Sequence, residues 1–285
     1  MNSREWSAPA KLNLFLHVIG RRPDGYHRLQ TVFQFLDHGD RLRVAPRDDG
    51  ELIVRHRMAG LDPDDDLVLR AARLLRESSG TSAGAELELT KVLPAGGGLG
   101  GGSSDAATAL VALNALWGLD WSEDALAELG LKLGADVPVF VRGRAAWAEG
   151  VGEELTPVDL PQPWYLVIHP GVGVATADIF RAPDLNRDRE PITIRDFLAG
   201  AGENTLEPVV AAREPEVAAA LAWLGERAPA RMTGSGACLF AAFDEPEAAE
   251  AVCREVPARW HAFVARGRNR SPLFAASEEP VSTGA

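Results

Sequence analysis

A run of glycines is the part of this sequence with the clearest chemical meaning. Residues 94–104 read Pro-Ala-Gly-Gly-Gly-Leu-Gly-Gly-Gly-Ser-Ser. Because glycine adds no side chain to a core and loses the most conformational entropy on folding, the run predicts close approach of backbone to a ligand. Alternation over 86–92 predicts a strand before it, and the apolar spacing over 103–117 predicts a helix after it. Such a loop directs backbone N–H groups and the positive end of a helix at one point, which suits a phosphate.

Two familiar phosphate-binding patterns do not describe this loop. Gly96, Gly98 and Gly101 satisfy G-x-G-x-x-G, but a dinucleotide fold also needs an acidic residue about 20 residues further on, after a second strand. Asp120 instead falls just past the predicted helix. A Walker loop needs a lysine after the last glycine, where this chain has Ser103. A flexible Gly/Ser linker is the remaining alternative, and the position between a strand and a helix argues against it.

Four separated segments together resemble the GHMP kinases, the family of galactokinase, homoserine kinase and mevalonate kinase. They are the glycine loop continued to Ala107, residues 8–14 with Pro23-Asp-Gly-Tyr-His27, Gly134-Ala-Asp-Val-Pro138, and Thr233-Gly-Ser-Gly-Ala237. The segment at 23–27 narrows the resemblance to a branch whose substrate carries a cytidine diphosphate group. The resemblance implies an α+β, two-lobed GHMP kinase fold, with an N-terminal ribosomal-protein-S5-domain-2-like lobe and a C-terminal ferredoxin-like lobe.

The resemblance also implies phosphoryl transfer from ATP with Mg²⁺ to a hydroxyl of a small molecule. Lys11 and Asp136 match the family's catalytic pair, in which the carboxylate accepts the hydroxyl proton and the ammonium keeps that carboxylate ionised. From the residues alone, Lys11 would be a solvated side chain of a strand and Asp136 an ordinary turn residue. The magnesium ligand stays open between Ser103, Ser104 and Glu149.

The resemblance gives the substrate a set of expected contacts: Asn13, Tyr26, His27, Thr176 and Phe180. Tyr26 and Phe180 are expected to stack on the two faces of cytosine, and His27 to hydrogen-bond its edge. Stacking of this kind contributes roughly 1–3 kcal/mol per base, which is enough to anchor the substrate.

The nucleotide has its own set of expected contacts: Pro94, Ala95, Gly96, Gly97, Gly98, Leu99, Gly100, Gly101, Gly102, Ser103, Ser104 and Asp66. The turn containing Gly234, Ser235 and Gly236 is expected to pack beside this loop. The chain has Asp66 where the family commonly has Asn, which leaves the adenine contact open, and Thr205 where Asp is common. Asp105 is expected to be structural, because its charge would repel phosphate if it faced the ligand.

Two alternative functions are consistent with the same sequence. One is a GHMP kinase for another small alcohol, such as homoserine or a mevalonate derivative, and the pair Tyr26-His27 argues against it because those alcohols carry no base. The other is a catalytically silent nucleotide-binding protein, and the presence of both Lys11 and Asp136 argues against it.

Composition excludes several classes of protein. The 285-residue chain has a formal net charge of −12, which argues against nucleic acid as a partner. It contains no apolar run of about 18 residues, so no membrane span is expected. Cys238 and Cys253 match no metal or redox spacing. Without a recognisable signal peptide, the expected location is the cytoplasm.

The hydrophobic pattern predicts the elements that position these residues. Strands are expected over 11–19, 27–35, 40–45, 51–56, 86–92, 139–141, 144–149, 164–169, 238–243 and 260–265. Helices are expected over 67–78, 103–117, 123–133, 176–180, 204–214, 216–228 and 245–255. Pro157 and the prolines that follow it favour a boundary between an N-terminal domain, 1–156, and a C-terminal domain, 157–275, with a disordered tail over 276–285.

Overall fold

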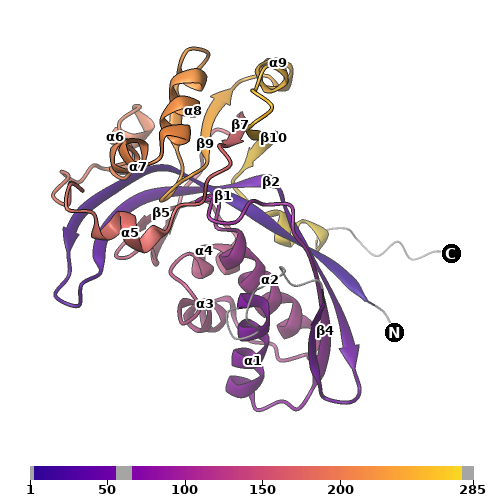
Figure 1. Ribbon diagram of the computed structural model, residues 1–285. Coiled ribbons are helices and arrows are strands. Elements are labelled where there is room, and N and C mark those ends of the chain that lie inside the picture. Colours follow the sequence, from indigo (N-terminus) through magenta and orange to yellow (C-terminus); the bar gives the residue numbers. More distant parts are fainter. Residues whose placement is uncertain (1–2, 56–65, 278–285) are drawn as a thin grey trace.

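Two long antiparallel strands form a central hairpin in the molecule. The computed structural model describes residues 3–55 and 66–277. Strand β1 (Arg4–Arg21) pairs along most of its length with β2 (His27–Arg47), and this hairpin crosses the whole molecule in Figure 1. The sequence predicted two strands where β2 is continuous. That prediction was wrong because a register shift between Pro9 and Lys11 lets pairing continue past the polar residues around Gly39.

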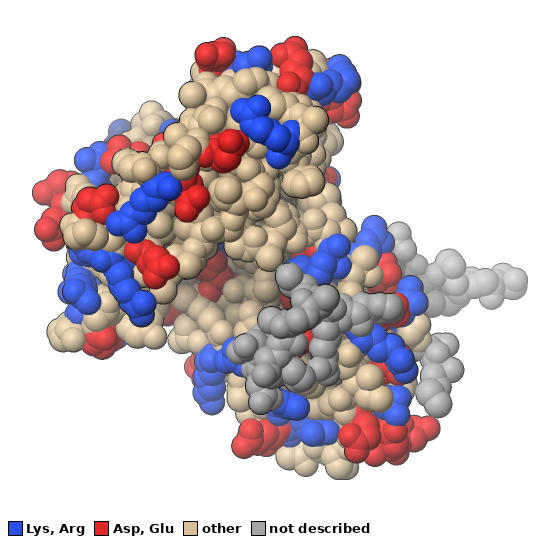
Figure 2. All heavy atoms as spheres, viewed as in Figure 1, with Lys and Arg blue, Asp and Glu red and all other residues tan. Residues whose placement is uncertain are grey.

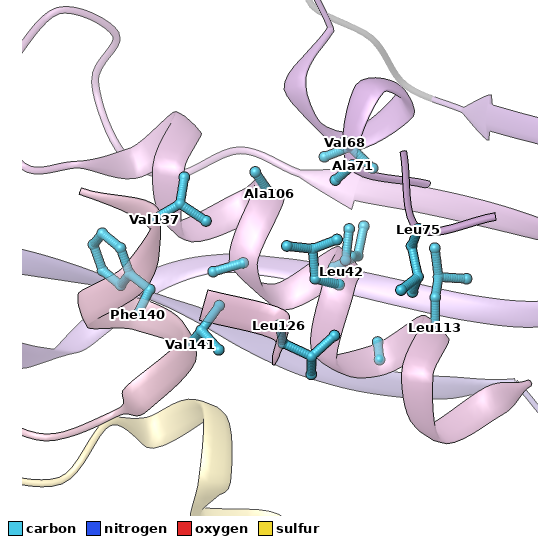
Figure 3. Close-up of a cluster of buried hydrophobic side chains, with 14 of the residues drawn as sticks. Leu42, Val68, Ala71, Leu75, Ala106, Leu113, Leu126, Val137, Phe140 and Val141 are labelled. Carbon is cyan, nitrogen blue, oxygen red and sulfur yellow. The ribbon is translucent and has the colours of Figure 1, made fainter. Parts of the chain in front are cut away.

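Four helices cover one face of the hairpin and make the N-terminal lobe. They are α1 (Leu67–Ser79), α2 (Gly101–Leu116), α3 (Glu123–Leu131) and α4 (Val137–Arg142). Strand β4 (Gly84–Thr90) pairs with β2, and β3 (Leu52–Arg55) runs parallel to β4, while β5 (Ala146–Glu149) pairs with β2 and with β6 (Glu154–Pro157). Side chains from the four helices and from β2 meet in one apolar core (Figure 3).

One predicted strand is part of a helix instead. Residues 139–141 lie in α4, although their valines favour a strand. Pro138 stands in the first turn of that helix and Gly143 ends it in a left-handed conformation, which are ordinary helix boundaries. All three residues are buried against α2 and α3, so tertiary packing overrides the local preference.

The C-terminal lobe is an antiparallel sheet in the order β10-β7-β9-β8. Its strands are β7 (Trp164–His169), β8 (Ala230–Met232), β9 (Leu239–Phe243) and β10 (His261–Arg268). Its helices are α5 (Thr176–Arg181), α6 (Ile194–Leu198), α7 (Glu207–Arg213), α8 (Pro215–Gly225) and α9 (Pro246–Arg254). With α8 and α9 as the two crossover helices, this strand order is ferredoxin-like, as expected.

The two lobes share the hairpin. Strand β10 pairs with β2 at Leu36 and Phe35, and the chain ends its described part in a short 3₁₀ helix, Pro272–Ser277. Figure 1 shows the N-terminal helices on one side of the hairpin and α7, α8 and α9 on the other. The expected domain boundary after residue 156 falls inside β6 and stays a prediction. The expected tail lies outside the described residues from 278 onward.

No helix within residues 3–55 and 66–277 is both long and apolar enough to cross a membrane.

Candidate active site

The glycine loop joins β4 to α2 and presents an open helix start. Gly100 is the residue before the helix, has φ +72°, and provides no side chain to cap the first-turn N–H groups. The loop is held by the second glycine turn, because Ala237 N donates to Gly96 O at 3.2 Å and Cys238 N donates to Gly97 O at 3.1 Å. Backbone donors fixed in this way at a helix N-terminus are suited to binding phosphate.

Close packing explains why two of the loop positions are glycine. Gly98 has φ +73°, and a Cβ added there would overlap the carbonyl oxygen of Thr233. A Cβ on Gly100 would lie 2.9 Å from Lys11 Cε and 2.9 Å from Phe140 Cζ. Both distances are shorter than carbon atoms tolerate, so the loop reaches the second turn and the lysine only without side chains.

Lys11 is buried and points to the loop from β1. Its Nζ lies 3.1 Å from Asp136 Oδ2, and it donates to Asn13 Oδ1 at 2.5 Å and to Gly98 O at 3.1 Å. The lysine side chain is 4% exposed and the Asp136 side chain 32%. Asp136 precedes α4 without using its carboxylate as a helix cap. The Asp136 carboxylate is therefore accessible to a ligand. The Lys11 ammonium beside it is held by three acceptors.

A hydrogen-bond chain fixes which end of the Asn13 amide faces the lysine. Thr31 donates its hydroxyl proton to Phe15 O, so the same hydroxyl oxygen accepts from Asn13 Nδ2, at 2.9 Å. The Asn13 carbonyl oxygen is thereby turned to Lys11. Sequence reasoning missed Thr31, because a threonine in a strand is ordinary and no local pattern marks it.

A cavity of about 590 Å³ has the loop, Lys11 and Asp136 in its wall. Figure 2 shows a hollow between the two lobes. The N-terminal lobe contributes Val54 of β3, Leu67 of α1 with its N-cap Asp66, and Leu89 of β4 with Lys91 just after that strand. Residues from β2, the β5–β6 turn, α5 and the segment before α7 complete the wall, including Leu29, Val151, Thr176, Phe180 and Leu206. Residues of both lobes therefore line the cavity, and the ion pair of Lys11 and Asp136 forms part of its wall.

Comparison with known proteins decides the family. The model of the GHMP kinases N terminal domain matches residues 66–144, and that of the GHMP kinases C terminal domain matches residues 184–262. The chain belongs to the GHMP kinase family. It is 58% identical to 4-diphosphocytidyl-2-C-methyl-D-erythritol kinase of Alkalilimnicola ehrlichii, over 95% of this chain and 94% of that protein. For the protein of the same name from Halorhodospira halophila the identity is 53%, over 98% of each.

A solved structure agrees with this assignment. The crystal structure of a 4-(cytidine 5'-diphospho)-2C-methyl-D-erythritol kinase superposes with a TM-score of 0.81 at 36% identity, covering 93% of this chain and 99% of the other. The two-lobed α+β fold predicted from the sequence is thus confirmed. As a GHMP kinase, the chain uses ATP.

Most of the residues expected at the site of this GHMP kinase line the cavity. They are Lys11, Asn13, Asp66, residues 94–103, Asp136, Thr176, Phe180 and residues 234–236. Ser104, Tyr26 and His27 lie outside the wall. The Ser104 side chain is buried in α2 with no hydrogen-bond partner in the described structure. Of the two serines, it is therefore Ser103 that can reach a ligand.

Asp66 caps the first turn of α1. Its Oδ1 accepts from Val68 N at 2.9 Å and from Leu69 N at 3.0 Å, and the residue is 5% exposed. Asparagine and aspartate serve equally well as N-caps, so Asp66 fills this position without loss of the cap. The residue reaches the cavity as part of a rigid helix start.

The oxygen donors in the wall fit a magnesium ion that arrives with ATP. Mg²⁺ is usually held by one or two protein oxygens together with substrate phosphates. Ser103 supplies such an oxygen, whereas Glu149 lies outside the wall and accepts from Gln30 at 2.8 Å. Among the described residues no group of three His, Cys, Asp or Glu could hold a metal by itself.

Of the three rings expected around the base, those of His27 and Phe180 are in contact. His27 stacks on Phe180, with ring centroids 5.1 Å apart and an interplanar angle of 29°. Tyr26 follows the hairpin turn and is 65% exposed. Within the described residues no ring contact joins Tyr26 to Phe180. The stacking of cytosine between Tyr26 and Phe180 therefore stays a prediction.

A buried ionic cluster holds the start of α2 to the strand before the loop. Lys91 Nζ donates to Asp105 Oδ2 at 2.8 Å and to Asp40 Oδ2, and Asp40 also accepts the backbone N–H groups of Val92 and Leu93. Burial, together with the charge of Asp40, raises the pKa of Asp105 to about 7 even though Lys91 opposes the shift. These contacts fit the structural role expected for Asp105, although the residue also lines the cavity wall.

We expect the stability of Asp105→Asn relative to the wild type to be higher at pH 8 than at pH 5. In the wild type the folded state holds a proton on Asp105 that the unfolded chain releases near pH 4, so this contribution to the free energy of unfolding falls as the pH rises from about 4 to about 7. The amide still accepts from Lys91 and carries no charge to desolvate. The relative gain is on the order of 1–3 kcal/mol.

Urea unfolding of both proteins at pH 5 and pH 8 measures this difference. The matched control is Asp124→Asn, because the Asp124 side chain is 77% exposed and pairs with Arg142 at the surface. The control should shift stability little and equally at both pH values. A pH-independent difference for Asp105→Asn would refute the expected titration.

Proposed function

We propose that this chain transfers the γ-phosphoryl group of Mg·ATP to the 2-hydroxyl of 4-diphosphocytidyl-2-C-methyl-D-erythritol. The products are the 2-phosphate and ADP, and the reaction is a step of the non-mevalonate isoprenoid precursor pathway, placed in the cytoplasm. The observation that carries the proposal is the ion pair of Lys11 and Asp136 in the wall of the same cavity as the glycine loop. Identities of 58% and 53% to proteins named for this activity support the choice of substrate.

In this mechanism Asp136 takes the proton of the attacking hydroxyl. Phosphoryl transfer depends mainly on positioning and on stabilising charge, with one residue to orient the nucleophile. The ammonium of Lys11, whose Nζ lies 3.1 Å from Asp136 Oδ2, pairs with this carboxylate and is placed to face the developing negative charge. Since Asn13 and Gly98 O hold the same ammonium, its position is set before the substrate binds.

The glycine loop and α2 would hold the phosphates. The first-turn N–H groups of α2 and the positive end of its dipole would face the β- and γ-phosphates, and the Ser103 hydroxyl would supply an oxygen to magnesium. Magnesium, when bound, would neutralise charge on the transferred group. The net charge of −12 makes this local positive site necessary for an anionic ligand.

An assay that couples ADP release to a visible readout tests the function. We expect ADP to form with ATP, Mg²⁺ and the cytidine substrate together, and not when that substrate is omitted. ADP formation with homoserine or mevalonate instead would support a GHMP kinase for another alcohol. ATP binding without turnover of any of them would support a silent nucleotide-binding protein.

We expect Tyr26→Ala to raise the KM for the cytidine substrate by about 5- to 100-fold, which is the loss of one stacking interaction. The KM for ATP should be unchanged, because Tyr26 lies in the turn between β1 and β2 and not at the glycine loop. Steady-state kinetics with each substrate varied in turn measures both. Leu131→Ala, an exposed apolar residue on α3, is the control. An unchanged KM for the cytidine substrate would remove Tyr26 from the site.

A further inference from the structure

Arg187 joins α5 to the end of the long hairpin, and no sequence motif marks this residue. Its Nη2 donates to Phe180 O at 2.9 Å and to Ala182 O at 2.7 Å, and its Nη1 donates to Leu185 O at 3.0 Å. The remaining Nε–H donates to His27 Nε2 at 3.1 Å. Figure 1 shows α5 beside the hairpin. Four N–H groups of one planar guanidinium are thus engaged, which fixes its position.

The hydrogen bond from Arg187 determines where His27 carries its proton. An arginine N–H is only a donor, so His27 Nε2 must present a lone pair. A neutral imidazole with a lone pair on Nε2 has its hydrogen on Nδ1. Burial, followed by the charges of Arg187 and Arg21, lowers the pKa of His27 and favours this neutral form. The ring plane is fixed as well, because it stacks on Phe180.

We propose that Arg187 is a positioning residue for base recognition: it makes His27 a hydrogen-bond donor at Nδ1, and this donor selects cytosine over uracil. The inference rests on the proposed function and on the contact expected between His27 and the edge of the base. Cytosine presents a lone pair at N3, whereas uracil carries a hydrogen there. A donor held at His27 Nδ1 forms a hydrogen bond with cytosine N3. With uracil the same donor would face the N3–H group, so that two donors would oppose each other.

Removing Arg187 should weaken this selection. Without it His27 can carry its proton on either nitrogen and can accept from uracil N3–H. In Arg187→Met we expect the preference in kcat/KM for the cytidine substrate over its uridine analogue to fall by about tenfold or more, the effect of one buried hydrogen bond. The KM for the cytidine substrate should rise, while kcat changes much less and the KM for ATP stays constant.

The matched control is Arg189→Met. Arg189 is two residues away, is 43% exposed and pairs with Glu203 at 3.2 Å, without a contact to His27 among the interactions described. It should leave the preference for cytosine unchanged. A double variant tests the route of the effect: on a His27→Ala background, Arg187→Met should cause no further loss of selection. An equal further loss would show that Arg187 does not act through His27.

A measurement on the wild-type chain is independent of turnover and of how the variant folds. In ¹⁵N-histidine-labelled protein without substrate, NMR should show His27 protonated at Nδ1, and protonation at Nε2 would overturn the inference. Wild-type enzyme that turns over the cytidine substrate while Arg187→Met keeps full selection would also overturn it. Wild-type enzyme that turns over neither nucleotide substrate would refute the proposed function instead, and the NMR result would still decide the tautomer.

Discussion

Asp136→Asn is expected to lower kcat by ~10²–10⁴-fold, the usual contribution of a general base. The amide has the same shape but does not accept a proton, so the hydroxyl nucleophile loses its acceptor. The KM for ATP should change little, because the glycine loop makes its hydrogen bonds to residues 237–238 and to Lys11, not to Asp136. A loss confined to kcat would identify an interaction used in the transition state.

Steady-state kinetics with both substrates saturating measures the loss. Asp124→Asn serves again as the control, since it removes a carboxylate that pairs with a cation at 2.8 Å but lies on α3, away from the cavity wall. Turnover close to that of the wild type in Asp136→Asn would exclude Asp136 as the base. Equal losses in the two variants would point to a general effect of charge.

The position of the glycine loop was predictable because its sequence signals are local. Six glycines between a strand pattern and a helix pattern predict a turn that approaches other backbone closely, and the structure places ten loop residues, 94–103, in the cavity wall. That this loop binds phosphate stays a prediction. The helix after the loop was predicted from its spacing of apolar residues, and it begins within two residues of the expected position. Nothing in these features depends on a distant part of the chain.

The surroundings of the two candidate catalytic residues could not be predicted in the same way. A lysine among leucines in a strand is ordinarily solvated, yet Lys11 is buried because the loop, Asn13 and the start of α4 close over it. The contacts of Thr31 and Arg187 link segments 16 and 160 residues apart. Such pairs are set by the pairing of β1 with β2 and by the position of α5 against the hairpin, and no local pattern records them.

The local pattern was misleading where burial is complete. Residues 139–141 follow a proline and consist of two valines and a phenylalanine, a composition that favours a strand. In α4 every one of them faces a neighbouring helix or the hairpin, so an alternation of buried and exposed residues never develops. Periodicity distinguishes helix from strand only when one face of the element meets water.

Gly98→Ala should abolish most of the activity by displacing the glycine loop. The residue has φ +73°, where a side chain is strained, and its Cβ would overlap Thr233 O. Strain of this kind costs about 1–3 kcal/mol. Relief of the overlap requires the two glycine turns to separate, which displaces the Gly98 carbonyl that accepts from Lys11. We therefore expect kcat/KM for ATP to fall by ~10²-fold or more, as a misplacement of about 1 Å can cause.

Gly80→Ala separates the effect of the overlap from that of the backbone angle. Gly80 has φ +69°, close to that of Gly98, and a Cβ there would meet no atom within 4 Å. Urea unfolding should show a loss of about 1 kcal/mol or more for each variant, from the unfavourable φ. Only Gly98→Ala should also weaken the binding of a non-hydrolysable ATP analogue in a calorimetric titration. If both variants bound the analogue as the wild type does, close contact between the two turns would not be what shapes the phosphate site.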